Sequence, residues 1–179
     1  MLGLAYSLAA RPGKGAAVSW PALYRRALGN PPGALDGAVV NSAAWRAAEI
    51  PAINGHGTAR AVAGFYHALS AGKALSATML AEAVTPQCAG PDRVFGEDNA
   101  WGLGFGIGED GYGMGGVGGS YGGTSLAGGY SIGFVTGSAG SFERVDALEN
   151  ALRSCLGLPP IPDGGEPSGQ PTSNPTCPR

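Results

Sequence analysis

A glycine-rich stretch in the second half of the chain limits the possible folds more than any other feature. In residues 111–120, apolar side chains alternate with glycine in the run Gly-Tyr-Gly-Met-Gly-Gly-Val-Gly-Gly-Ser. Sixteen positions between residues 102 and 137 are glycine. A period of two is typical of a β-strand, and glycine in a strand marks a place that backbone or ligand approaches closely. The stretch therefore predicts a strand with one bare face, which suits the wall of an active site.

Length and composition favour one folded domain, because the chain has 179 residues of which 44% are hydrophobic. The formal net charge of −2 and the 13% of charged residues argue against binding to nucleic acid, which needs clustered lysine and arginine. The densest basic pair, Arg25-Arg26, fits a solvated helix face. No apolar run is long enough to cross a bilayer, and no basic leader precedes the apolar stretch at residues 1–10. These features predict a soluble, cytoplasmic protein.

The cysteines and histidines indicate neither a disulfide framework nor a metal site. Cys88, Cys155 and Cys177 are odd in number, widely spaced and form no C-x-x-C pair. The possible co-ligands are limited to His56 and His67. We therefore expect no metal and no cofactor, and we expect Cys155 to be a small core residue on the apolar side of a helix.

Capping residues and apolar spacing predict four helices in the first half of the chain. The first is expected over residues 19–28, with Ser19 as cap and Pro21 in the first turn. The others are expected over residues 42–48, between Thr58 and Gly72, and over residues 76–84. The apolar stripe of the third helix is expected to comprise Ala61, Phe65, Ala68 and Leu69. An irregular loop over residues 49–57 precedes this helix, and loops of this kind often face a cleft.

The second half of the chain is expected to form an antiparallel meander of three or four strands. Alternation of Trp101, Leu103, Phe105 and Ile107 with glycine predicts one strand over 101–107. Two Gly-Gly pairs then separate strand-like runs near 112–117, 120–127 and 130–136, and such pairs favour tight hairpins. In the last of these runs, one face carries Tyr130, Ile132, Phe134 and Thr136.

A final helix is predicted after Ser141, which would cap it, with Glu143 in the first turn. Its apolar positions, expected to lie across the meander, are Val145, Leu148, Leu152 and Cys155. The C-terminal end is rich in proline, glycine and serine. The predicted organisation is an N-terminal segment (1–18), a folded part (19–158) and a flexible tail (159–179), with an α/β fold of the α+β type.

Two serine motifs match nucleophile patterns by letter. Residues 118–122 match G-x-S-x-G with Ser120 as nucleophile, but a strand is expected after it, where a nucleophile elbow has a helix. Both histidines also precede Ser120, whereas that fold supplies its histidine last. Ser70 and Lys73 have S-x-x-K spacing, but Gly72 places them at the end of a helix, not at its start. The structural alternatives are a hairpin turn at Ser120 and an exposed helix end at Lys73.

Two further patterns are less specific. Gly106, Gly108 and Gly111 fit the G-x-G-x-x-G fingerprint of dinucleotide sites, but that fingerprint needs a following helix and a strand is expected here. His56 lies in the glycine-flanked loop, where contact with a ligand competes with a turn or capping role. His67, inside the third helix, is expected to be structural.

Four separate motifs together resemble a known family. They are the loop 49–60 (Glu-Ile-Pro-Ala-Ile-Asn-Gly-His-Gly-Thr-Ala-Arg), the run 101–105 (Trp-Gly-Leu-Gly-Phe), the run 113–120 and the segment 133–136 (Gly-Phe-Val-Thr). In this order and spacing they resemble the C-terminal part of beta-lactamase-related serine hydrolases, which include class C-like esterases and penicillin-recognising enzymes. The resemblance covers about residues 20–158 and implies a beta-lactamase/transpeptidase-like fold without its N-terminal portion.

The resemblance also implies roles for individual residues. Met114, Gly115 and Gly116 would occupy the strand motif that has the letters K-T-G, H-x-G or W-G-G in the family, and the N–H of Val117 would be one of two oxyanion donors. The candidate substrate-binding residues are Met114, Gly115, Gly116, Asn54 and His56. Because Met114 replaces a polar residue that usually helps to bind a carboxylate, apolar esters are favoured over beta-lactams.

The family's nucleophile, however, is not found in the expected place. The chain has no Y-x-N tripeptide, and its one S-x-x-K is the motif at Ser70. We therefore expect the C-terminal part of an esterase-type hydrolase, through truncation, a late start or gene decay, that is inactive alone and acts on a small ester or amide if completed. The alternatives are a non-catalytic module that pairs or self-associates through an exposed sheet edge, and an independent hydrolase that uses Ser120.

Overall fold

The fold is described from a computed structural model, which describes residues 22–92, 94–95, 98–116, 118–137 and 141–161. The predicted segment 1–18, Ser19, Pro21 and most of the predicted tail lie outside these residues. The helices are α1 (Ala22–Leu28), α2 (Gly37–Val40), α3 (Ala43–Ala47), α4 (Ala59–Ser70), α5 (Ala77–Ala83) and α6 (Glu143–Cys155). The strands are β1 (Cys88–Pro91), β2 (Asp98–Trp101), β3 (Gly106–Ile107), β4 (Gly111–Gly115), β5 (Tyr121–Ser125) and β6 (Tyr130–Phe134).

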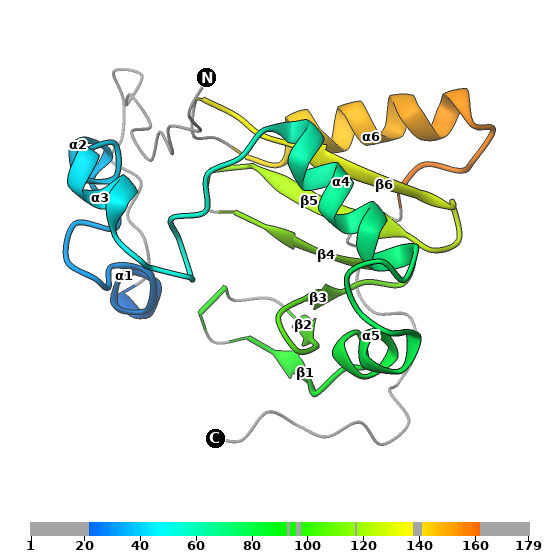
Figure 1. The fold of residues 1–179 in the computed structure, drawn as a ribbon, viewed down its shortest axis with the longest axis horizontal. Helices are drawn as coiled ribbons and strands as arrows, with labels where there is room; N and C mark the ends of the chain where they lie inside the picture. Colours follow the sequence, from blue (N-terminus) through cyan, green and yellow to red (C-terminus); the bar gives the residue numbers. More distant parts are fainter. Residues whose placement is uncertain (1–21, 93, 96–97, 117, 138–140, 162–179) are drawn as a thin grey trace.

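The strands form one six-stranded antiparallel sheet whose spatial order follows the sequence from β1 to β6 (Figure 1). This confirms the meander, but the sheet has more strands than we predicted. The expected strand over 101–107 is wrong, because the chain turns inside it. Gly102 N–H donates to the carbonyl of Phe105 at 2.8 Å, and Gly104 has φ +88°, which glycine adopts without a steric cost. The turn separates β2 from β3, and β1 was not predicted at all.

The helix boundaries follow the capping residues. The side chains of Ser42, Thr58 and Ser76 each accept a hydrogen bond from a backbone N–H in the first turn, as an N-cap does. These contacts confirm the predicted starts of α3, α4 and α5. The short helix α2, capped by Asp36, was not predicted. Ser141 does not cap α6, because the N-cap position is Phe142 and no side chain caps that end.

Two helices cover opposite faces of the sheet. On one face, a Cβ added to Gly122 would lie 2.5 Å from side-chain atoms of Val62 and Tyr66, so α4 rests almost directly on β5. A Cβ on Gly133 of β6 would lie equally close to the α4 backbone. On the other face, α6 contacts β6, since Tyr130 donates a hydrogen bond to Glu149 at 2.6 Å. Tyr130 and Gly133 point to opposite faces because side chains alternate along a strand. The sheet therefore forms the middle layer.

The apolar stripes that we predicted for both helices are shifted. The side chains of α4 that pack into the core are Val62, Tyr66 and Leu69, whereas Phe65 is 52% exposed. In α6, Val145 is buried as predicted, but Leu148 and Cys155 are exposed. In α4 the error has a physical cause. Alanine fills many positions of this helix, so the sequence does not show which of its faces packs closely on the glycines of the sheet.

Two clusters of buried side chains stand out among the residues that the structure describes. Tyr66, Leu69 and Tyr112 form the larger one, between α4 and the sheet, with leucines, Phe105 and Ile107 around them. A smaller cluster of Ala34, Val40 and Trp45 holds α2 and α3. Cys155 is a free thiol on the surface, not the core residue that we predicted, and Cys88 is disulfide-bonded, which we did not expect. Among the described residues, no helix has the length and apolar character needed to cross a membrane.

Candidate active site at the end of strand β4

The C-terminal end of β4 carries the predicted wall residues. Met114 is 41% exposed and pairs in register with Gly122 of β5. Paired residues share a face of the sheet, and the space beside Gly122 holds Val62 and Tyr66 of α4. Met114 therefore lies on the face covered by α4, next to that helix. Gly115 is also exposed, and the strand ends there without a bulky side chain.

A tight turn joins this end of β4 to β5. The N–H of Gly116 donates to the carbonyl of Ser120 at 2.7 Å, and the N–H of Gly119 donates to the carbonyl of Gly116 at 3.0 Å. Gly118 and Gly119 have φ values of +121° and +88°, a conformation that favours glycine. Val117, the predicted oxyanion donor, lies outside the described residues. The hydrogen bonds on either side of it hold both ends of the turn.

The loop that precedes α4 lies at the same end of the sheet as Met114. The carbonyl of Ala59, in the first turn of α4, lies against Gly133 of β6. Gly133 pairs with Gly122, which pairs with Met114. The start of α4 is therefore level with the end of β4, and in the view of Figure 1 the loop passes the end of the sheet where β4 turns into β5. The structure thus brings two separate candidate segments to one place.

Asn54 is fully engaged within this loop. Its side-chain amide donates to the carbonyls of Trp45 and Ala48, and its side-chain oxygen accepts from the N–H of Ile50 at 3.1 Å. These bonds tie the loop to the end of α3. The side chain of Asn54 therefore shapes the loop through backbone contacts.

His56 is exposed and has one free ring nitrogen. Its Nδ1 lies 2.7 Å from the carbonyl oxygen of Asn54. A carbonyl can only accept, so Nδ1 carries the proton and Nε2 of the neutral ring is an acceptor directed elsewhere. Among the described residues, no hydrogen bond joins His56 to Met114, Gly115 or Gly116.

The opposite face of the wall is covered by Phe142, which sequence analysis did not identify. A Cβ on Gly115 would lie 2.7 Å from the tip of the Phe142 ring. Phe142 precedes α6, so the ring comes from the layer on the far side of the sheet. The end of β4 is therefore backed by an aromatic ring on one face and exposed at Met114 on the other. Nothing near either residue in the sequence indicates that the bulky ring of Phe142 lies against Gly115, which has no side chain.

The other candidate motifs are structural in this fold. Ser120 is followed by strand β5, and its Oγ accepts a hydrogen bond from the N–H of Thr136 at 3.2 Å. Ser70 is the last residue of α4 and its Oγ donates to the carbonyl of His67 at 3.0 Å, so the S-x-x-K motif lies at a helix end. Gly106, Gly108 and Gly111 form the hairpin between β3 and β4, where no helix follows.

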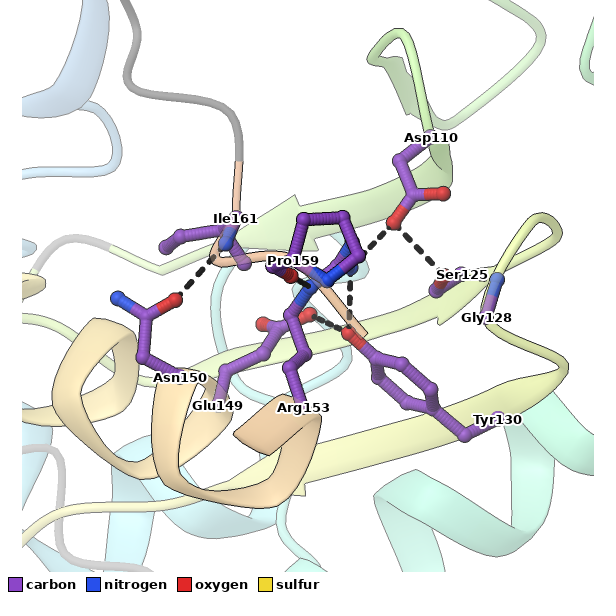
Figure 2. Close-up of polar contacts among 9 residues, drawn as sticks. All are labelled: Asp110, Ser125, Gly128, Tyr130, Glu149, Asn150, Arg153, Pro159 and Ile161. Carbon is purple, nitrogen blue, oxygen red and sulfur yellow. Dashed lines mark hydrogen bonds and ion pairs between the residues drawn. The ribbon is translucent and has the colours of Figure 1, made fainter. Parts of the chain in front are cut away.

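A charged network occupies the other end of the same strands (Figure 2). Asp110 forms a salt bridge with Arg153 of α6 and accepts from Ser125 Oγ at 2.7 Å. Arg153 also donates to the hydroxyl of Tyr130 at 3.0 Å, and that hydroxyl donates to Glu149. Burial would raise the pKa of Asp110, but the hydrogen bonds from Arg153 and Ser125 and the charge of Arg153 outweigh it, so the pKa lies below its usual value. The partners satisfy one another, which indicates a structural role.

This network also holds the chain that leaves α6. Arg153 donates through Nε to the carbonyl of Pro159, and the N–H of Ile161 donates to the side chain of Asn150 at 2.8 Å (Figure 2). These residues, at the start of the predicted tail, are therefore held against α6. In the part of the chain that the structure describes, no group of three or more histidine, cysteine or acidic side chains is arranged to hold a metal ion.

A family model described as Beta-lactamase matches residues 6–154. The chain belongs to the beta-lactamase family. A crystal structure of a family VIII carboxylesterase is 31% identical to it and superposes with a TM-score of 0.59. That match covers 66% of this chain but only 35% of the carboxylesterase chain. Among curated proteins, no sequence matches.

The match to the beta-lactamase family confirms the family resemblance that the sequence motifs indicated. The similarity to a carboxylesterase also confirms the fold class, an antiparallel sheet with helices on its faces. The chain spans about a third of the carboxylesterase chain. In the described part of the chain, the candidate wall at the end of β4 and the loop before α4 lie at the same end of the sheet.

Proposed function

We propose that this chain supplies one wall of the active site of an esterase-type serine hydrolase, which cleaves carboxylic esters through an acyl-enzyme. The observation that carries the proposal is the end of β4. There a strand without bulky side chains meets a turn held by the bond from Gly116 N–H to Ser120, beside the loop that precedes α4.

The chemistry follows from what this end of the strand offers. Without side chains at Gly115 and Gly116, the carbonyl of an ester can lie against the backbone, and the N–H of Val117 can donate to the oxygen on which negative charge develops. A preorganised donor of this kind contributes roughly 3 to 4 kcal/mol of transition-state stabilisation in serine hydrolases. Met114 adds an apolar surface beside the site, which suits the acyl or alcohol part of an ester.

The loop before α4 has two proposed tasks. Asn54 holds its shape through three backbone contacts, and His56 presents Nε2 as an acceptor for a donor group of the substrate. Asn54 therefore acts on the substrate through the position of the loop. The carboxylesterase similarity supports an ester as the substrate class.

The chain alone is expected to be inactive, because neither candidate serine is placed as a nucleophile. The Oγ atoms of Ser120 and Ser70 are both engaged with backbone groups. A fluorescent fluorophosphonate should therefore fail to label the purified chain, and ester turnover should be the same for Ser120→Ala and the parent. Stoichiometric labelling at Ser120, with turnover lost in Ser120→Ala, would establish the independent hydrolase instead.

The oxyanion site can be tested by binding, without turnover. Ethyl butylphosphonate carries a tetrahedral anionic centre like that of an ester hydrolysis intermediate. Its titration should shift the backbone N–H resonances of residues 116–120 in an ¹⁵N spectrum. Val117→Pro removes the proposed donor and should abolish the shifts, whereas the matched Val117→Ala keeps the N–H and should bind like the parent. Equal binding by both variants, or no shift in the parent, would refute the site.

A further inference from the structure

We propose that Ser120 is a positioning residue that fixes the turn after β4 and with it the proposed oxyanion site, an inference that rests on the proposed function. Ser120 stands between the turn and β5 and is partly buried. Its carbonyl accepts from the N–H of Gly116 at 2.7 Å, and its Oγ accepts from the N–H of Thr136 at 3.2 Å. One residue therefore ties the end of β4 to the chain that follows β6.

A regular ladder between β5 and β6 would give Thr136 a different partner. In that ladder Tyr121 pairs with Phe134. Two residues further along, Thr136 would lie opposite Gly119. The backbone groups of successive residues in a strand point to alternate sides. Since the carbonyl of Ser120 points toward β4, the carbonyl of Gly119 would point toward β6 and accept from Thr136 if the ladder continued.

The hydroxyl of Ser120 takes the place of that carbonyl. It accepts from the N–H of Thr136, while the N–H of Gly119 donates to the carbonyl of Gly116 at 3.0 Å within the turn. Gly118 and Gly119 are thereby released from the ladder and adopt φ values of +121° and +88°, which suit a turn. A side-chain acceptor at position 120 thus ends the ladder where the turn meets β5.

The position of the turn matters because a donor to a developing anion is effective when it is held in place before the reaction. Without an acceptor at position 120, the N–H of Thr136 would lose its hydrogen bond, and pairing with Gly119 in its place would distort the turn. The chain after β6 also supports the end of β4, where the ring of Phe142 lies against Gly115. Ser120 therefore serves the proposed site through its acceptor oxygen and not as a nucleophile.

The test compares Ser120→Thr, which keeps a hydroxyl, with Ser120→Val, which has the same shape without it. Both variants of the full chain are titrated with ethyl butylphosphonate and followed in ¹⁵N spectra, because the chain alone is expected to turn over no ester. Ser120→Thr should bind like the parent, and Ser120→Val should bind roughly fivefold more weakly, the effect of one lost hydrogen bond. Equal binding by Ser120→Val and the parent would overturn the inference and leave the proposed function intact.

Amide hydrogen exchange reports on the turn without the phosphonate. In Ser120→Val, exchange at Gly119 and Thr136 should be about tenfold faster than in Ser120→Thr, while the amides of α4 stay unchanged. Equal exchange at Gly119 and Thr136 in the two variants, or faster exchange throughout α4, would overturn the inference. If the parent failed to bind the phosphonate but exchange changed as expected, the proposed oxyanion site would be refuted and the hold of Ser120 on the turn would be supported.

Discussion

The strands β4, β5 and β6 end in two very different ways. At one end, Asp110, Ser125, Tyr130 and Arg153 form a partly buried network that ties α6 to the sheet. At the other end, backbone hydrogen bonds hold the turn at Gly116, and Met114 is exposed. The difference shows that side-chain contacts stabilise one end of the sheet, whereas the other end has few side chains and is held by its backbone. Charged side chains gather at the network end, and the opposite end, where we propose the substrate wall, is held by backbone contacts alone.

The two ends also differ in how their close contacts arise. The Arg153 side chain is 5% exposed and contacts Asp110 and Tyr130 of the sheet layer as well as the carbonyl of Pro159. At the open end, closeness comes from absent side chains, as where the Phe142 ring lies against Gly115. Substitutions should therefore act in opposite ways, by removing partners at the network end and by adding atoms at the open end.

The largest expected effect is at the network end. Arg153→Met should lower the free energy of unfolding by about 3 kcal/mol, because it leaves the carboxylate of Asp110 without its cation. Chemical denaturation monitored by circular dichroism measures this change. Arg46→Met is the matched control, since Arg46 is exposed on α3, and it should change stability by less than about 0.5 kcal/mol. A loss below about 1 kcal/mol in Arg153→Met would mean that the network is not the main anchor of α6.

A smaller effect is expected at the open end. Gly115→Ala should lower stability by about 1 to 2 kcal/mol, because its Cβ would lie 2.7 Å from the Phe142 ring. Gly137→Ala, where a Cβ meets nothing within 4 Å, serves as the control. In the double variant with Phe142→Ala, the penalty of Gly115→Ala should disappear. If the two substitutions were simply additive, Phe142 would not be the group that backs the strand.

The smallest expected effect is the loss of folding stability at low pH. The pKa of Asp110 is lowered in the folded state, so its contribution is present above the unfolded pKa of about 3.9 and is lost as pH falls through the folded pKa. Between pH 6 and pH 2, the parent should lose about 1 kcal/mol more stability than Asp110→Asn, which cannot be protonated. Denaturation curves at a series of pH values measure the difference. Identical acid profiles would show that other carboxylates account for the pH dependence.

Much of the local structure followed from the sequence. Ser42, Thr58 and Ser76 predicted three helix starts because a side-chain oxygen next to an apolar run satisfies free N–H groups of the first turn. The Gly-Gly pairs predicted the boundaries of β4, β5 and β6. The break at Gly102–Phe105 was missed, because alternation with glycine is the same in a strand and in a tight turn.

The candidate site was predicted only through several motifs together. The resemblance brought the loop at His56 and the strand at Met114 into one hypothesis, although nearly sixty residues separate them. Periodicity and spacing alone suggested nothing about Phe142 or Arg153, because the partners of both come from other layers. Arg153 was missed for a further reason: a buried arginine is tolerated only when distant partners meet it, here the carboxylate of Asp110 before β4 and the hydroxyl of Tyr130 in β6.

The sequence by itself determined the starts of α3, α4 and α5, the antiparallel meander and the bare strand end at Met114–Gly116, because caps, turns and glycine act over a few residues. Tertiary structure alone decided which face of α4 and α6 is buried, that the charged network closes one end of the sheet, and that the loop before α4 reaches the other. The physical reason is the distance along the chain over which each interaction acts. Packing and ion pairing join residues whose neighbours are known only once the layers of the fold are in place.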